Sequence, residues 1–269
     1  NKSMKQKPVV CYLFTKFDED KSLINFKTNY LNYKSGYDHD LIISYKLINN
    51  VKIRDLNEKL YNIDYQIFID PVIKNDFDFG TYKRISEKFM ERDILFINGH
   101  SYPICDDWLK KLMKYKEERT LIGTSASNES LYSSIKLKRK YKIFSYLLRK
   151  YRFKKNFLRF PNPHIRTSSF LIKGKYLFNY IQKIKINNKE DTWKIESGFN
   201  GLTNYLKKND FNIYVVNSDG EKYTEKNWKF SRTYNFLNQN KSIISDKHTR
   251  KYLLLNSVDQ KTAQTKIWG

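Results

Sequence analysis

The segment Pro8-Val9-Val10-Cys11-Tyr12-Leu13-Phe14 sets the pattern for the rest of the chain. It is short, apolar throughout and contains β-branched residues, which favours a strand buried on both faces of a sheet. A polar loop follows it at residues 15–20. Similar apolar runs predict further buried strands at residues 41–45, 66–69, 94–97 and 121–123.

Helical patterns lie between these strands, at residues 22–33, 79–89 and 106–116. Strands that alternate with helices, and that are apolar throughout, indicate an α/β fold whose mainly parallel sheet is covered on both faces. The second half of the chain continues the pattern, with a strand at 169–172, a helix at 195–208 and a strand at 212–216.

The regular alternation ends near Glu225. We therefore predict one domain over residues 1–225 and an irregular C-terminal arm, residues 226–269, that packs on the same domain. A length of 269 residues suits one domain with an extension.

The formal charge of +23 is concentrated in one part of the chain. The sixty residues between Glu129 and Glu190 contain no acid and 17 lysines and arginines. No apolar run approaches the roughly 20 residues of a spanning helix, and no secretory leader opens the chain. Cys11 and Cys105 lie inside apolar runs and indicate reduced thiols. We expect a cytoplasmic protein.

Ligands of an open parallel sheet bind beyond the carboxyl ends of its strands. Residues 15–18, 70–80, 98–102 and 124–129 follow the predicted strands and contain small polar side chains suited to a sugar and a nucleotide. The chain contains neither G-x-G-x-x-G after the first strand nor a phosphate-binding G-x-x-x-x-G-K-[ST] loop. These absences argue against a dinucleotide-binding protein and against a P-loop protein.

The order of motifs from about residue 8 to 225 resembles that of the Rossmann-like GT-A glycosyltransferases, specifically those that assemble bacterial or viral surface glycans. The matching motifs are Asp78-Phe79-Gly80-Thr81-Tyr82, residues 93–101, residues 106–112, residues 122–127, His164-Ile165-Arg166-Thr167-Ser168-Ser169-Phe170-Leu171-Ile172 and Glu196-Ser197-Gly198. The resemblance implies transfer of a hexosyl or deoxyhexosyl group from a nucleotide sugar to a glycan or lipid-linked acceptor.

One motif departs from that family. Many of its members end the fourth strand with D-x-D, which holds a divalent metal under the donor diphosphate, whereas this chain has Asn98-Gly99-His100. Without those carboxylates a hard cation is held weakly. We therefore expect no essential cofactor, although Asp70 or Asp78 could supply carboxylates from elsewhere.

The resemblance also implies roles for individual residues. Glu196, at a predicted helix start where the helix dipole favours its charged form, is the candidate base for inverting transfer, and Asp191 is its rival. Fixed cations should replace the metal at the diphosphate. The candidates for that role are Arg166, His164, His100 and His248.

The remaining donor contacts would come from the strand ends and the helix that follows the third strand. Candidates for donor binding are Thr15, Asp78, Gly80, Tyr82 and Asn98. Trp193 could stack on an acceptor sugar. Three of these residues have an alternative, purely structural role. Thr15 would be an ordinary polar loop residue, Asp78 the cap of the helix that follows it, and Trp193 a side chain that packs into the core.

Residues 135–155 suggest a further surface. Apolar residues fall roughly on one helical face and basic residues surround them, as in a helix that lies on anionic lipid. The apolar residues are Ile135, Tyr141, Phe144, Leu148 and Tyr151. We expect peripheral association with the inner face of a membrane, or use of this surface by an acidic glycan; the alternative is a stripe that packs on the sheet.

Three other functions fit parts of the sequence. A nucleic-acid-binding protein would suit the charge, but no helix-turn-helix, RNP or zinc-finger pattern accompanies it, so we expect no nucleic-acid partner. A sugar-nucleotide nucleotidyltransferase would show a glycine-rich loop after the first strand, and residues 14–18 contain no glycine. A glycan-binding relative without catalysis stays open because D-x-D is missing.

Overall fold

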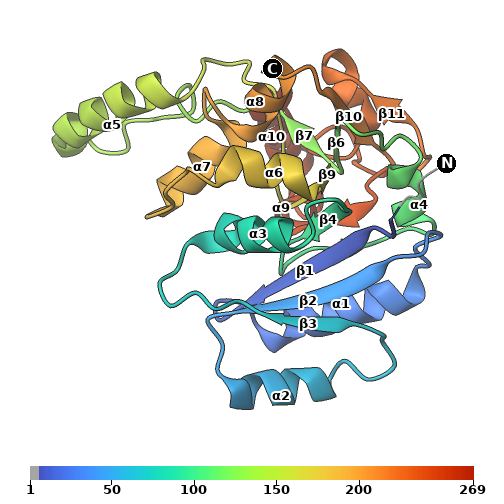
Figure 1. The fold of residues 1–269 in the computed structure, drawn as a ribbon. Helices are drawn as coiled ribbons and strands as arrows, with labels where there is room; N and C mark the ends of the chain where they lie inside the picture. The colour runs from blue at the N-terminus through green and yellow to red at the C-terminus, as the bar shows by residue number, and fades with distance from the viewer. Residues whose placement is uncertain (1–5) are drawn as a thin grey trace.

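The computed structural model describes residues 6–269, so the first five residues of the predicted domain lie outside it. An eight-stranded sheet forms the centre, in the order β11-β10-β6-β9-β4-β1-β2-β3 (Figure 1). Its strands are β1 (Val9–Thr15), β2 (Asp40–Lys46), β3 (Gln66–Ile69), β4 (Asp93–Ile97), β6 (Thr120–Gly123), β9 (Ser169–Lys173), β10 (Asn212–Val216) and β11 (Lys222–Tyr223).

The sheet is mostly parallel, which confirms the predicted fold class. Strand β1 runs parallel to both β2 and β4, and β6 runs parallel to β10. Strand β9 is antiparallel to both of its neighbours, β4 and β6. The start of β9 therefore lies at the same edge of the sheet as the ends of β4 and β6.

Helices cover both faces because successive side chains of a strand point to opposite sides. Val10, Tyr12 and Phe14 of β1 pack in one core; the helices on that side are α1 (Asp20–Asn32), α2 (Asn50–Glu58) and α4 (Trp108–Met113). Val9, Cys11 and Leu13 pack in the opposite core; the helices there are α3 (Phe77–Lys88), α6 (Gly174–Ile181) and α8 (Leu202–Lys208).

Two helical predictions need correction. Helix α2 was not predicted, because only Ile53 and Leu56 are buried on it and its start depends on the Asn49 side chain, which accepts a hydrogen bond from the Lys52 amide. The helix predicted at 195–208 is two helices, α7 (Lys189–Ser197) and α8, separated near Gly198. A Cβ at Gly198 would lie 2.4 Å from the Lys194 carbonyl oxygen, which explains the glycine at this break.

The C-terminal arm lies against the domain and contains two helices that the sequence did not predict. Its elements are the 3-10 helix η2 (Glu225–Ser231), β12 (Ile244–Ser245), α9 (Lys247–Leu253) and α10 (Ser257–Trp268). Strand β12 pairs with β5 (Tyr102–Pro103), just after β4. The Ile267 carbonyl accepts a hydrogen bond from the Asn128 amide, so the end of the chain is fixed beside β7 (Ala126–Ser127).

Helix α5 (Ile143–Asn156) projects from the body of the protein (Figure 1). A short 3-10 turn, η1 (Lys140–Lys142), precedes it, so Ile135 and Tyr141, which the sequence predicted on the same helical face, lie outside the helix. The alternative that its apolar stripe packs on the sheet is wrong, because Phe144 and Leu148 are exposed. No helix within residues 6–269 is long and apolar enough to span a bilayer.

Candidate active site

A cavity of about 700 Å³ opens at the edge where β1, β4 and β6 end and β9 begins. The antiparallel direction of β9 brings the residues just before it to this edge, and the C-terminal arm forms the opposite wall. Seven of the twelve predicted site residues line the cavity: Asp78, Asn98, His164, Arg166, Trp193, Glu196 and His248.

Glu196 lies in the last turn of α7, not at a helix start. The helix dipole therefore does not favour its charge, and that part of the prediction is wrong. Its Oε2 atom accepts hydrogen bonds from the backbone amide of Thr167, at 2.7 Å, and from the Thr167 hydroxyl. No hydrogen-bond partner for Oε1 occurs within residues 6–269. One carboxylate oxygen is thus fixed and the other is available to a substrate.

Asp78 is a second carboxyl group on the cavity wall, in the first turn of α3. Desolvation, followed by the charge of Asp18, raises its pKa to about 6, and Lys46 opposes this effect. The N-cap position of α3 is Asp76, whose side chain makes no capping hydrogen bond, so Asp78 is not the N-cap. A carboxyl whose pKa is shifted towards neutrality in a cavity is typical of a functional group.

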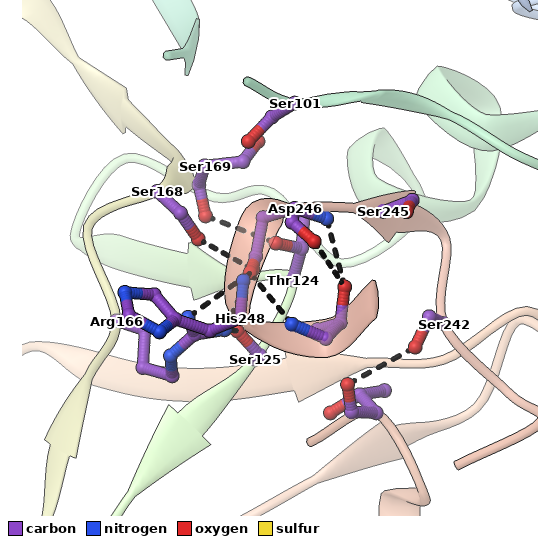
Figure 2. A network of polar contacts seen from close by, with 12 residues as sticks. Ser101, Thr124, Ser125, Arg166, Ser168, Ser169, Ser242, Ser245, Asp246 and His248 are labelled. Carbon is purple, nitrogen blue, oxygen red and sulfur yellow. Dashed lines mark hydrogen bonds and ion pairs between the residues drawn. The ribbon is translucent and has the colours of Figure 1, made fainter. Parts of the chain in front are cut away.

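Arg166 has a carboxylate partner that the sequence did not reveal. Its guanidinium forms two hydrogen bonds with Asp246 and one with the Ser125 hydroxyl (Figure 2). It also lies 3.7 Å from the centre of the Tyr234 ring. Burial raises the pKa of Asp246, but the charge and hydrogen bonds of Arg166, together with the hydrogen bond from the Thr249 amide, outweigh it and lower that pKa to about 2. This pair is internally neutral and joins the start of β9 to α9.

Two histidines on the cavity wall are poor cations. Burial lowers the pKa of His164, whose Nδ1 lies 2.7 Å from the Asn162 carbonyl oxygen. Burial and then the charge of Arg166 lower the pKa of His248. Both imidazoles are therefore neutral near pH 7, and they can exchange hydrogen bonds with a ligand without adding charge.

Lysines of the C-terminal arm bring positive charge to the same wall. Lys251 lies one turn after His248 on α9, lines the cavity and is exposed. Lys266 of α10 also lines it, but pairs with Glu129 at 2.7 Å. Within residues 6–269, no carboxylate lies within 4.0 Å of the Lys251 ammonium. The sequence analysis missed Lys251 because nothing in the pattern of residues 226–269 indicated that this arm closes the cavity.

Five predicted residues lie outside the large cavity. The Tyr82 ring packs in the core, 4.4 Å from that of Phe96. Gly80 permits close approach of Asp76, since a Cβ would lie 1.9 Å from the Asp76 Cγ. Asp191 accepts hydrogen bonds from the backbone amides of Asn187 and Asn188 at the start of α7, so it caps that helix away from the cavity.

The other two of these five, Thr15 and His100, gather around Asp18 near the ends of β1 and β4. The Thr15 amide and hydroxyl both donate to Asp18 Oδ2, at 2.8 and 3.0 Å. His100 Nε2 lies 3.3 Å from Asp18 Oδ1. Asp18 thus has partners in its own loop and in the loop after β4, and these residues fix the geometry of the strand ends next to Asp78.

The residues at the end of β4 do not fit a divalent metal of the kind that D-x-D would hold. Asn98 Oδ1 already accepts from the Ser101 hydroxyl at 2.5 Å. No group of three or more His, Cys, Asp or Glu side chains within residues 6–269 is arranged to hold a metal. Hard cations need several oxygen ligands, which this strand end does not gather.

A smaller cavity of about 260 Å³ shares four residues with the large one: Asp78, Thr167, Trp193 and Glu196. The Trp193 ring is half-buried and lies edge-on to Phe153 of α5, with ring centres 6.4 Å apart. Glu196 and Asp78 therefore stand between two spaces, one large enough for a nucleotide and one suited to a single ring.

No family model and no curated protein matches this sequence. Among solved structures, the apo form of the glycosyltransferase GlyE of Streptococcus pneumoniae is 10% identical with a TM-score of 0.48, over 97% of this chain and 63% of that one. The galactosyltransferase LgtC, in complex with donor and acceptor sugar analogs, is 10% identical with a TM-score of 0.47, over 78% of this chain and 73% of that one.

The structures similar to this chain include one that is not named a glycosyltransferase. The 4-diphosphocytidyl-2C-methyl-D-erythritol synthase of Anaerococcus prevotii is 12% identical with a TM-score of 0.46, over 83% of this chain and 96% of that one. At such low identities and TM-scores below 0.5, these similarities concern the fold and decide nothing about the reaction. The function is therefore argued from the residues of the cavity.

Proposed function

We propose that this chain is a glycosyltransferase that moves a sugar from a nucleotide sugar to a hydroxyl of a glycan or lipid-linked glycan acceptor. The supporting observation is the position of Glu196 on the wall shared by the two cavities, with Thr167 fixing one of its oxygens. The nucleotide sugar would fill the large cavity, and the acceptor would enter through the small one beside Trp193.

In the proposed reaction, the acceptor oxygen forms a bond to the anomeric carbon while the bond from that carbon to the diphosphate oxygen breaks. The hydroxyl proton passes to Glu196 Oε1, and the electron pair of the broken bond leaves with the nucleoside diphosphate. A single displacement of this kind inverts the anomeric carbon. A positioned base contributes about 10²–10⁴-fold to such a transfer.

The leaving diphosphate would be stabilised by the C-terminal arm. Lys251 supplies a charge that no carboxylate among residues 6–269 pairs with, and His248, one turn away, supplies a hydrogen bond. Groups fixed before the reaction stabilise charge as it develops. The sequence suggests Arg166 for this role, but its guanidinium is paired with Asp246. We therefore assign Arg166 to positioning α9 and the residues that α9 carries.

The donor sugar would lie near Asp78 and Asn98. The Asp78 carboxylate can accept hydrogen bonds from sugar hydroxyls once it is ionised. Because burial disfavours the ionised form in the free protein, such hydrogen bonds would stabilise the carboxylate more than they would in water. No step passes through a metal, because the end of β4 does not gather the ligands.

Glu196→Gln tests the proposal. Transfer from a panel of nucleotide sugars to oligosaccharide acceptors should fall by about 10²–10⁴-fold, with nucleoside diphosphate binding nearly unchanged. Glu190→Gln is the matched control, because Glu190 lies on the same helix, pairs with Arg152 and does not line either cavity.

Three results would contradict the proposal. One is transfer by Glu196→Gln within about twofold of the parent, well short of what loss of a base costs. Another is release of pyrophosphate from a nucleoside triphosphate and a sugar phosphate, which would indicate a nucleotidyltransferase. The third is oligosaccharide binding by the parent protein without transfer from any donor in the panel.

A further inference from the structure

Helix α5 and the turn before it present an apolar face that no part of the described chain covers. The side chains of this face, here called the arm face, are 53–73% exposed; they are Tyr141, Ile143, Phe144, Leu147, Leu148 and Tyr151. Ile143, Leu147 and Tyr151 follow one another at intervals of four residues, and Phe144 and Leu148 lie beside them. This spacing places them on one side of the helix.

The other end of the helix is firmly attached to the body. Phe153 and Phe157 are buried, with ring centres 5.1 Å apart. The carbonyl oxygen of Asn156 accepts a hydrogen bond from the Phe199 amide at 2.7 Å. Arg152 pairs with Glu190 of α7 at 2.8 Å. The arm face is therefore held away from the body by an anchored base, as Figure 1 shows for α5.

Basic side chains surround the arm face. Residues 136–155 contain ten lysines and arginines and no acid. Within residues 6–269, only one of these ten basic side chains, Arg152, has a carboxylate within 4.0 Å. Its neighbours Arg149 and Lys150, and Lys142 at the other end of the helix, keep their charge uncompensated.

We infer that the arm face is a docking surface for an anionic lipid membrane. Exposed aliphatic side chains bordered by uncompensated basic residues match an acyl layer beneath negative headgroups. A second copy of this chain is a poorer occupant, because it would bring two sets of basic residues together. A nucleic acid would neutralise the charge but offers nothing to Ile143, Leu147 and Leu148.

The arm also connects this surface to the candidate active site. Its base contacts α7 through Phe153 and Arg152, and α7 carries Trp193 and Glu196 on the cavity walls. A membrane bound by the arm face would therefore be linked, through the anchored base of α5, to the helix that carries Trp193 and Glu196. The use of this arrangement for a lipid-linked acceptor rests on the proposed function. The binding of the arm face to lipid does not depend on that function.

Vesicle sedimentation tests the surface directly. The parent protein should bind vesicles of phosphatidylcholine mixed with phosphatidylglycerol, lose most of this binding at high salt, and bind phosphatidylcholine alone weakly. The double substitution Phe144→Glu with Leu148→Glu should lower binding by about tenfold or more per side chain. The double substitution Lys142→Gln with Lys150→Gln should lower it by roughly fivefold per residue.

Val51→Glu with Ile73→Glu is the matched control. These residues are 71% and 95% exposed, lie in α2 and the loop after β3, and receive the same change in charge. The control should bind lipid as the parent does, and circular dichroism should show the same helix content in every variant. Release of nucleotide from a donor sugar in solution should be unchanged in Phe144→Glu with Leu148→Glu, so that a failure of catalysis is distinguished from a failure of lipid binding.

Five outcomes would overturn the inference. Four of them are absence of binding to either kind of vesicle, equal and salt-insensitive binding to both kinds, unchanged lipid binding after Phe144→Glu with Leu148→Glu, and a dimer in solution that this variant dissociates. The last would assign the arm face to a second copy of the chain. Loss of nucleic-acid binding, rather than lipid binding, in the same variant would also overturn it.

Discussion

The guanidinium of Arg166 and the carboxylate of Asp246 form a buried pair, with Nη1 and Oδ2 2.7 Å apart and Nη2 and Oδ1 3.2 Å apart. Asp246 also accepts hydrogen bonds from the amides of His248 and Thr249, so it begins α9 as well as binding Arg166. One carboxylate thus fixes the C-terminal arm over the cavity.

Asp246→Asn should destabilise the protein by about 3–5 kcal/mol, because it leaves the buried guanidinium of Arg166 without its counter-charge. Urea unfolding measures the change. Arg166→Met with Asp246→Leu should cost less than Asp246→Asn, since no charge is left buried without a partner. Equal or larger destabilisation by the double substitution would show that the pair does not act through its charges.

The pH dependence of this pair has a definite sign. The pKa of Asp246 is lowered from 3.8 to about 2, so the folded protein binds fewer protons than the unfolded chain in this range. The stability that the pair contributes is complete above about pH 4 and is lost as the pH falls towards 2. Asp246→Asn should therefore lose less stability than the parent as the pH falls from about 4 to about 2. Urea unfolding at a series of pH values measures the free energy of unfolding over this range. The same loss of stability in both proteins would contradict the lowered pKa of Asp246.

The sequence predicted the sheet and much of one cavity wall because both depend on local patterns. Apolar runs located the strands, and the carboxyl-end rule brought Asp78 and Asn98 to one edge. The other wall depends on contacts between residues far apart in the chain. Arg166 meets Asp246 across 80 positions, and no local pattern marks Asp246 as its partner or Lys251 as a residue of the same cavity. The break after α7 was missed because residues 195–208 keep a helical spacing across it.

Asp78→Asn should stabilise the free protein at neutral pH. The pKa of Asp78 is raised from 3.8 to about 6, so the folded state binds more protons than the unfolded chain, and the parent loses stability as the pH rises from about 4 to about 6. The asparagine removes this loss. Thermal unfolding at pH values on either side of this window measures it, with Asp38→Asn as an exposed control.

The same substitution should weaken binding of the nucleotide sugar while leaving binding of the free nucleotide unchanged, because we place Asp78 at the sugar. Calorimetric titration with the donor and with its nucleotide separates the two. Equal weakening of both ligands would place Asp78 at the nucleotide instead, and a lower melting temperature for Asp78→Asn would show that its carboxyl is not destabilised by burial.

Lys251→Ala should weaken a nucleoside diphosphate by roughly 10–150-fold, the range for loss of a hydrogen bond to a charged group of about 1.5–3 kcal/mol. The corresponding monophosphate should lose much less, because we place Lys251 at the leaving phosphate. Lys247→Ala is the matched control on the same helix, as Lys247 does not line the cavity. Equal losses for both nucleotides would remove Lys251 from this role.

Chelation should leave the transfer rate unchanged. The end of β4 offers the Asn98 amide, which Ser101 already engages, and His100, whose only nearby carboxylate within residues 6–269 is Asp18. An amide oxygen and one imidazole hold Mg²⁺ poorly, since that ion prefers a complete set of oxygen ligands. Initial rates with and without EDTA measure the effect, with a metal-dependent phosphatase treated alongside to show that chelation is complete. Full loss of transfer that Mn²⁺ or Mg²⁺ restores would mean that carboxylates such as Asp18 and Asp78 rearrange around a metal when the donor binds, and that Lys251 does not replace it.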